Sequence, residues 1–234
     1  MRESQFILAD SRPLTEKVSL LRMKGDCSAI AAPGQFVAVE IPGKYLRRPF
    51  SVCDWDEDWF TIVVERVGAG TEYLQQIPVG TALTVMTGLG NGFAFDPDSA
   101  APLLIGGGTG LSPLVGLCRR MAAVGLRPQV LLGFRDARDA FGQDLFPGAE
   151  VRVAEDVFAM LDEIPHDCFY ACGSEAMMTE LCRRERVGGQ VAFDVRMGCG
   201  FGACMGCSKK TTGGMKRVCK DGPVFRKEEL VWDD

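Results

Sequence analysis

Four cysteines in the last part of the chain have a spacing that suits iron–sulfur chemistry. Cys199, Cys204 and Cys207 are separated by four and by two residues, and Cys219 follows after eleven more. This is the C-x4-C-x2-C spacing with a distant fourth cysteine that is typical of plant-type [2Fe–2S] proteins. Small residues between the cysteines allow the backbone to wrap closely and to direct N–H groups at sulfur. The sequence therefore predicts a [2Fe–2S] site with these four thiolate ligands.

Zinc is the alternative occupant of these four cysteines. Zinc sites with four thiolates usually combine two separated C-x2-C pairs, so the glycine-rich four-residue gap favours the cluster. The remaining cysteines without such spacing are expected to be buried apolar residues; they are Cys27, Cys53, Cys118, Cys168 and Cys182.

The chain has a single histidine, which excludes a multi-histidine metal site and a Rieske centre. His166 stands in the turn-like sequence Pro165-His166-Asp167, and no nucleophile motif accompanies it. We expect it to be a surface residue or a hydrogen-bonded loop residue.

A glycine-rich stretch at residues 106–110 is a candidate phosphate-binding loop. It follows an apolar strand at residues 102–105, and Ser112 and Pro113 are expected to be the N-cap and the first residue of a helix. Glycines let phosphates approach the backbone, and a helix N-terminus supplies aligned N–H groups and partial positive charge. The motif is not G-x-G-x-x-G, because position 111 is leucine, and a tight packing turn is the alternative. The residues are Gly106, Gly107, Gly108, Thr109 and Gly110.

A second candidate for phosphate and ring binding is Arg48-Pro49-Phe50-Ser51. An arginine can clamp a pyrophosphate with its planar fork, and a hydroxyl can reach a flavin ring nitrogen. Two arginines before a proline are also common in solvated turns, so this motif carries no assignment by itself.

The elements that must position these motifs fall into three groups. Residues 1–96 contain short β-rich segments separated by glycine and proline turns, which indicates an antiparallel barrel or sandwich. Residues 97–197 alternate apolar strands with helical segments, which favours a doubly wound parallel sheet. Residues 198–234 form a cysteine-rich tail that is too small to build its own core.

Composition limits the function classes. The chain has 234 residues with 47% hydrophobic and 24% charged residues, values of a globular protein, and a net charge of −5. This acidic balance argues against nucleic-acid partners and anionic membrane surfaces. No apolar run reaches the roughly 18 residues of a membrane span, and the N-terminal sequence lacks a signal-peptide pattern. Ten cysteines in such a chain favour cluster binding over disulfides, and we expect a cytoplasmic protein.

Taken together, the motifs resemble those of the ferredoxin–NAD(P)H reductase family, in which a barrel binds FAD and an α/β domain binds a nicotinamide nucleotide. Arg48-Pro49-Phe50-Ser51 resembles the flavin signature of the family, residues 106–110 resemble its nucleotide loop, and Cys172-Gly173 resembles its pair near the nicotinamide. The resemblance also implies flavin contacts from two further segments of the barrel, namely Val63, Val64 and Glu65, and Gly70 and Thr71. The Tyr-Arg pair expected before Gly68 is absent.

The tail is similar to that of one subfamily, the electron-transfer subunits of type B dihydroorotate dehydrogenase. The resemblance implies that dihydroorotate is oxidised at FMN in a partner catalytic subunit, with two copies of each chain in the complex. Electrons would then pass through [2Fe–2S] and FAD to NAD⁺, in pyrimidine biosynthesis. NAD follows from the resemblance alone, because Arg135, Asp136, Arg138 and Asp139 suit either NAD or NADP.

Two alternatives remain open at this point. The first is a flavin and iron–sulfur reductase module that serves another acceptor, such as ferredoxin or a sulfur compound. The second is a zinc-stabilised, nucleotide-binding regulatory protein without redox function, which would lack the colour of flavin and cluster.

Overall fold

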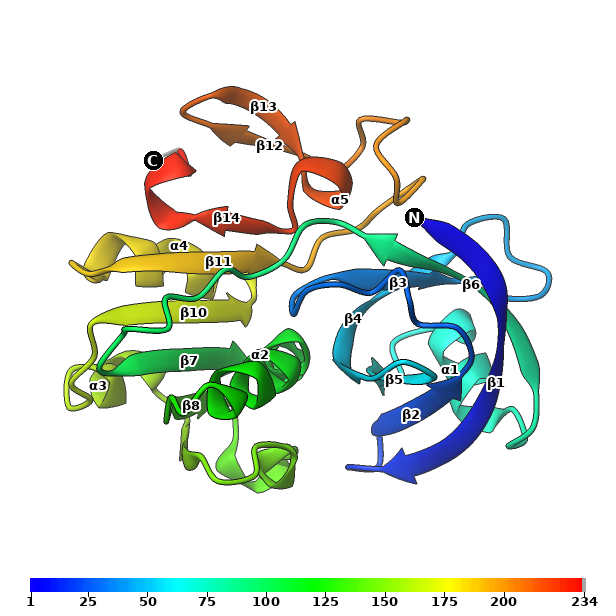
Figure 1. The fold of residues 1–234 in the computed structure, drawn as a ribbon, viewed down its shortest axis with the longest axis horizontal. Helices are drawn as coiled ribbons and strands as arrows, with labels where there is room; N and C mark the ends of the chain where they lie inside the picture. Colours follow the sequence, from blue (N-terminus) through cyan, green and yellow to red (C-terminus); the bar gives the residue numbers. More distant parts are fainter. Residues whose placement is uncertain (233–234) are drawn as a thin grey trace.

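The computed structural model describes residues 1–232, which form three parts in chain order (Figure 1). A closed barrel comes first, a parallel sheet with helices follows, and a short tail lies across one edge of that sheet. The predicted fold class, an antiparallel barrel plus a doubly wound parallel sheet with a small C-terminal segment, is confirmed.

Six antiparallel strands close the barrel in the order β1-β2-β5-β4-β3-β6. Alternate side chains along each strand point inward, and Phe6, Phe60 and Val85 are fully buried in this core. Helix α1 (Ala69–Gln76) follows β5 and was not predicted from the sequence. The strands are β1 (Arg2–Pro13), β2 (Val18–Lys24), β3 (Phe36–Val39), β4 (Arg48–Trp55), β5 (Trp59–Glu65) and β6 (Ala82–Leu89).

The second part is built on a six-stranded sheet in the order β14-β11-β10-β7-β8-β9, in which β14 alone is antiparallel to its neighbour. Its parallel strands are β7 (Pro102–Gly107), β8 (Gln129–Gly133), β9 (Glu150–Ala154), β10 (Cys168–Gly173) and β11 (Gly188–Phe193). The main helices are α2 (Ser112–Ala123), α3 (Val157–Leu161) and α4 (Glu175–Arg184), and short 3-10 turns are η1 (Gly108–Leu111), η2 (Ala137–Asp139) and η3 (Gln143–Leu145).

Helices cover both faces of this sheet. Leu114 and Leu117 of α2 pack on one face, whereas Leu161 of α3 and Met178 of α4 pack on the other. The strands are apolar on both sides because both faces are buried. Among residues 1–232, none of the helices combines the length and the apolar character needed to cross a bilayer.

The tail extends the sheet and contributes to its core. After the cysteine loop come the hairpin β12 (Ser208–Thr211) and β13 (Gly214–Arg217), then α5 (Val218–Asp221), β14 (Val224–Arg226) and η4 (Lys227–Glu229). β14 pairs with β11, and Cys207, Val218 and Phe225 are buried together with side chains of the sheet. The tail is stabilised by this shared core, in agreement with its small size.

Helix α2 joins the barrel to the sheet. A methyl group added at Gly116 would lie 3.0 Å from the carbonyl oxygen of Cys53 in β4, so the two backbones are in close contact. Arg119 of the same helix pairs with Asp54, with 3.0 Å between Nε and Oδ1, and donates to the carbonyl of Trp55 at 2.6 Å. These contacts fix α2 relative to strand β4 of the barrel.

Candidate cofactor sites

A cavity of about 300 Å³ lies between the barrel and the N-terminal end of α2. Neighbouring strands β4 and β5 supply one wall, and Thr109 of the glycine-rich segment and Ser112 at the start of α2 supply the other. The predicted flavin residues that line it are Arg48, Pro49, Phe50, Ser51, Val63, Glu65 and Thr71. Segments far apart in sequence thus converge on one space.

Arg48 has the position needed for an anion. Its guanidinium lies over the first turn of α1, because a methyl group added at Gly70 would be 3.1 Å from Nε of Arg48. Its Nη1 donates to the carbonyl of Leu46 at 2.7 Å, which orients the fork. A positive side chain beside the N-terminus of a helix suits a phosphate group, so these residues fit the pyrophosphate of FAD.

Two of the predicted flavin residues are engaged elsewhere in the fold. Val64 points into the barrel core and is fully buried, because it alternates with Val63 along β5. Thr71 lines the cavity, but its hydroxyl accepts from the N–H groups of Val67 and Gly68 at 2.9 and 3.2 Å and stabilises the start of α1.

Ser112 was expected to cap α2, and this prediction is wrong. The helix is preceded by the 3-10 turn η1, and Leu111 occupies the cap position without a side-chain hydrogen bond. Ser112 is instead the first residue of α2, and its hydroxyl donates to the carbonyl of Ser51 at 3.3 Å. The tertiary contact with the flavin strand therefore replaces the local cap.

Asp194 also lines this cavity and was not predicted. It directly follows β11, and desolvation by the surrounding groups raises the pKa of its carboxyl group. Burial, and secondly the charge of Asp194, raise the pKa of the Cys172 thiol at the end of β10. A lone carboxylate after a strand matches no motif, which explains why it was missed.

The glycine-rich segment lies at the point where the strand order of the sheet reverses. The chain runs from β7 to β8 and β9 on one side and then returns to β10 and β11 on the other. In such sheets the crevice at the carboxyl ends of the two central strands is the general ligand site. Here those strands are β7, which ends at Gly107, and β10, which ends at Gly173.

A cavity of about 540 Å³ opens at these strand ends. Gly107 and Gly108 line it, whereas Thr109 faces the flavin cavity. Gly106 and Gly110 serve close packing instead: a methyl group added at Gly110 would be 2.3 Å from the carbonyl oxygen of Cys172. Gly107 and Gly108 therefore expose their backbone to the cavity, whereas Gly110 allows the segment to pack directly against Cys172 and Gly173.

Acidic and basic groups both lie at the far end of this cavity. Arg135 and Glu155 line it, while Asp156 caps α3 by accepting from the N–H groups of Phe158 and Ala159 at 3.0 and 3.1 Å. Of the residues named from sequence, Asp136 is held by Arg138, whose hydrogen bonds lower the pKa of its carboxyl group.

The four cysteines of the tail form two neighbouring pairs. The N–H of Cys204 donates to the sulfur of Cys199 at 3.4 Å, and the N–H of Cys219 donates to the sulfur of Cys207 at 3.3 Å. Within residues 1–232, no three histidine, cysteine or acidic side chains converge as a single metal ion would require. Two pairs of thiolates fit a cluster with two irons, because each iron takes two sulfur ligands from the protein.

Backbone N–H groups surround the outer pair. Ala203 donates to the sulfur of Cys199 at 3.2 Å, and Gly206 donates to that of Cys204 at 3.4 Å. Burial acts to raise the pKa of Cys199, but hydrogen bonds from the backbone of Cys204 and Phe201 lower it to about 6. The loop can surround the sulfurs because Gly200, Gly202 and Met205 adopt positive φ values of 79°, 94° and 60°.

The remaining cysteines and the histidine have structural surroundings. Cys27, Cys53, Cys118 and Cys182 are buried as predicted, and Cys168 is half-buried. His166 contacts the carbonyl of Ile164 at 2.7 Å and the carboxylate of Glu185 at 3.0 Å, which agrees with a hydrogen-bonded loop residue.

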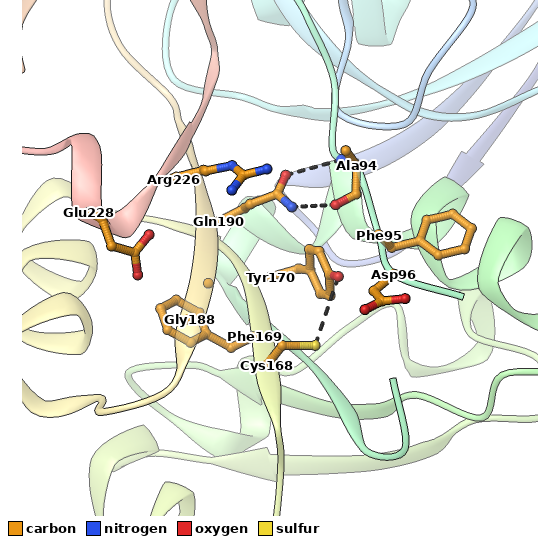
Figure 2. A pocket seen from close by; sticks show the side chains of 11 residues that line it. Ala94, Phe95, Asp96, Cys168, Phe169, Tyr170, Gly188, Gln190, Arg226 and Glu228 are labelled. Atoms are coloured by element: carbon orange, nitrogen blue, oxygen red, sulfur yellow. Dashed lines mark hydrogen bonds between the residues drawn. The ribbon is translucent and has the colours of Figure 1, made fainter. Parts of the chain in front are cut away.

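A further cavity of about 380 Å³ lies at the N-terminal ends of β10 and β11, where Cys168, Gly188 and Gln190 line it (Figure 2). In this cavity the side-chain amide of Gln190 accepts from the N–H of Ala94 at 3.1 Å and donates to the carbonyl of the same residue. These bonds fasten the segment between the barrel and β7 to β11. The cavity thus belongs to the attachment of the barrel rather than to the cofactor sites.

Comparison with known proteins agrees with this arrangement. Residues 194–231 match the iron–sulfur cluster binding domain of dihydroorotate dehydrogenase B. The electron transfer subunit of dihydroorotate dehydrogenase B (NAD(+)) from Caldanaerobacter subterraneus subsp. tengcongensis is 35% identical over 222 residues, which cover 86% of this chain and 87% of the relative. The subunit of that name from Bacillus caldolyticus is 33% identical, with 97% and 98% covered.

Solved structures share the fold. The structure of an NADH-dependent reduced ferredoxin-NADP oxidoreductase is similar with a TM-score of 0.86 and 26% identity, covering 98% of this chain and 90% of the other. Phthalate dioxygenase reductase is similar with a TM-score of 0.65 and 18% identity, covering 82% and 70%, and this likeness concerns the fold alone.

The barrel, the switch-point crevice and the cysteine tail together define a reductase of the ferredoxin–NAD(P)H reductase fold with an appended cluster segment. Within that class, the sequence identity over most of its length shows a narrower group. The chain belongs to the family of dihydroorotate dehydrogenase B (NAD(+)) electron transfer subunits.

Proposed function

We propose that this chain is the electron-transfer subunit of a type B dihydroorotate dehydrogenase in pyrimidine biosynthesis. It would carry electrons from dihydroorotate, oxidised at FMN on a partner catalytic subunit, through a [2Fe–2S] cluster and FAD to NAD⁺. The observation that carries the proposal is the cysteine tail, in which Cys207 and Cys219 are buried against the sheet and Cys199 and Cys204 form a second, more exposed pair. The acting compartment would be the cytoplasm, whose reducing conditions keep cysteines out of disulfides, so that four can bind the cluster and the other six remain thiols.

Each of the three parts of the chain would bind a different redox group. FAD exchanges a hydride with nicotinamide and single electrons with a cluster, so it belongs between the two. Residues 1–96 would hold FAD through Arg48 and the strand after it, residues 97–197 would hold NAD at Gly107 and Gly108, and residues 198–234 would hold the cluster. The protein positions these groups and needs no general base.

The surface around Cys204 suits contact with a partner subunit. Cys204 is exposed, and Phe201 and Met205 beside it expose 44% and 52% of their surface. Apolar side chains around an exposed ligand suit a docking surface, and a catalytic subunit seated there would bring its FMN close to the cluster. We propose an assembly with two copies of each chain.

Co-expression with a type B catalytic subunit tests this function. We expect a stable complex that contains FMN, FAD, iron and sulfide, and that reduces NAD⁺ with dihydroorotate, whereas neither chain does so alone. A catalytic subunit that fails to associate, or that reduces NAD⁺ equally well without this chain, would refute the assignment.

One alternative has specific support. The similarity to an NADH-dependent reduced ferredoxin-NADP oxidoreductase extends over nearly the whole chain, so a module that serves ferredoxin is the second candidate. It predicts that reduced ferredoxin, and not the dihydroorotate-oxidising subunit, supports NAD⁺ reduction by the purified chain.

A further inference from the structure

Arg217 connects the two halves of the cysteine site. It is the last residue of β13 and immediately precedes α5, the short helix that carries Cys219. Its Nη1 donates to the carbonyl of Gly202 at 3.0 Å, in the middle of the loop between Cys199 and Cys204. One guanidinium therefore joins the segment of the buried cysteine pair to the loop of the outer pair.

A carboxylate on the same helix holds this guanidinium in place. Asp221 accepts from the backbone N–H of Arg217 at 2.8 Å and from its Nε at 3.1 Å. The Arg217 side chain is only 26% exposed, so the pair is partly shielded from solvent.

The loop that Arg217 holds makes hydrogen bonds to the ligand sulfurs. Gly202 has a φ of 94°, and the next two residues, Ala203 and Cys204, donate their N–H groups to the sulfur of Cys199. The Gly202 carbonyl and the N–H of Ala203 belong to one planar peptide group, so fixing the carbonyl fixes the direction of that N–H. The charge acts as well, because reduction adds a negative charge to a site that already holds four thiolates, and a neighbouring cation favours the reduced form.

We propose that Arg217 is a positioning residue for the iron–sulfur cluster, which clamps the cluster loop onto α5 and raises the reduction potential, with Asp221 limiting that rise. The inference rests on the proposed function, since it requires the cluster. It concerns a residue that is not itself a ligand and that sequence spacing does not reveal.

The test compares four variants purified without oxygen. Arg217→Gln removes the charge, Arg217→Lys keeps the charge but removes the fork, and Asp221→Asn removes the opposing charge. Arg226→Gln is the matched control, because Arg226 also lies in the tail but lines the cavity at the N-terminal ends of β10 and β11. The measurements are iron and sulfide content, the midpoint potential followed by electron paramagnetic resonance, and the rate at which a chelator removes iron.

We expect Arg217→Gln to lower the potential and Asp221→Asn to raise it, while Arg226→Gln leaves it unchanged. Iron loss should be about tenfold faster or more in Arg217→Gln and Arg217→Lys, as expected when a charge-assisted hydrogen bond is lost. If Arg217→Gln takes up no cluster, its potential cannot be measured, and the other two variants test the inference. A raised potential in Asp221→Asn and faster iron loss in Arg217→Lys would then support it. Wild-type potential in Asp221→Asn together with wild-type iron loss in Arg217→Lys overturns the inference. A wild-type protein without iron and sulfide would instead refute the cluster in the proposed function.

Discussion

Replacing Gly110 by alanine tests how the structure brings the nucleotide segment and β10 together. The new Cβ would lie 2.3 Å from the carbonyl oxygen of Cys172 and 2.9 Å from the nitrogen of Gly173. Ordinary contacts begin at 3.4 Å, so the two backbones would have to separate by about 1 Å. The atoms in the way belong to the central strand of the sheet and cannot rotate aside as a side chain would.

We expect Gly110→Ala to lower the free energy of unfolding by about 1–3 kcal/mol, the usual cost of overpacking a dense interior. A shift of about 1 Å at a reacting centre can also slow a reaction by a factor of the order of 100, so reduction of the bound flavin by NADH should slow by a similar factor. Denaturant unfolding measures the first effect, and stopped-flow absorbance at the flavin band measures the second.

Gly188→Ala is the matched control for this prediction. Its new Cβ would meet only Glu228, at 3.9 Å, and Gly188 does not adopt a left-handed conformation. The change should alter stability by no more than about 0.5 kcal/mol and leave flavin reduction unchanged. Equal unfolding midpoints and equal flavin reduction rates for the two variants would refute the close crossing at Gly110.

Three further predictions concern single residues of the cofactor sites. Cys204→Ser should abolish the cluster signal but leave FAD bound, because the flavin cavity is built from other elements, and Cys168→Ser should change neither; unchanged iron and sulfide in Cys204→Ser would contradict the ligand assignment. Arg48→Ala should weaken FAD binding by about 1.5–3 kcal/mol, measured by titration of the apoprotein, whereas Arg47→Ala should not, because Arg47 pairs with acidic residues outside that cavity. Asp194→Asn should raise the flavin potential at pH 8, where the wild-type carboxylate is charged, and the difference should shrink as the pH falls through the raised pKa of Asp194; a difference that does not change with pH would refute this.

Local sequence patterns predicted those parts of the fold whose conformation is determined by residues that are neighbours in sequence. The apolar strand before residues 106–110 and the proline that follows them mark a strand-to-helix junction wherever they occur, and η1 and α2 begin there. The spacing of the cysteines is also a local pattern, because all four lie within one short tail. The pairs seen at Cys199 and Cys204, and at Cys207 and Cys219, follow from four residues in a short tail.

Features that depend on distant partners could not be predicted in this way. Ser112 has the side chain of a helix cap, but the carbonyl of Ser51 lies within its reach only after the barrel has packed on α2. Strand β14 pairs with β11 across more than thirty residues, and nothing in its three residues specifies that partner. Arg217 and Asp194 acquire their roles from what surrounds them, since neither belongs to a recognisable motif.

The chain connection between Asp194 and Cys199 limits how far the flavin cavity can be from the cluster. Asp194 lines the cavity, and Cys199, the first of the proposed cluster ligands, follows only five residues later. Five residues span at most about 17 Å even when fully extended. The end of β11 is held because the N–H of Phe193 donates to the carbonyl of Pro223 at 3.1 Å, and the loop after Cys199 is held because Arg217 donates to the carbonyl of Gly202 at 3.0 Å. One short segment therefore joins the flavin cavity to the cysteine loop, and it keeps Cys199 near the end of β11.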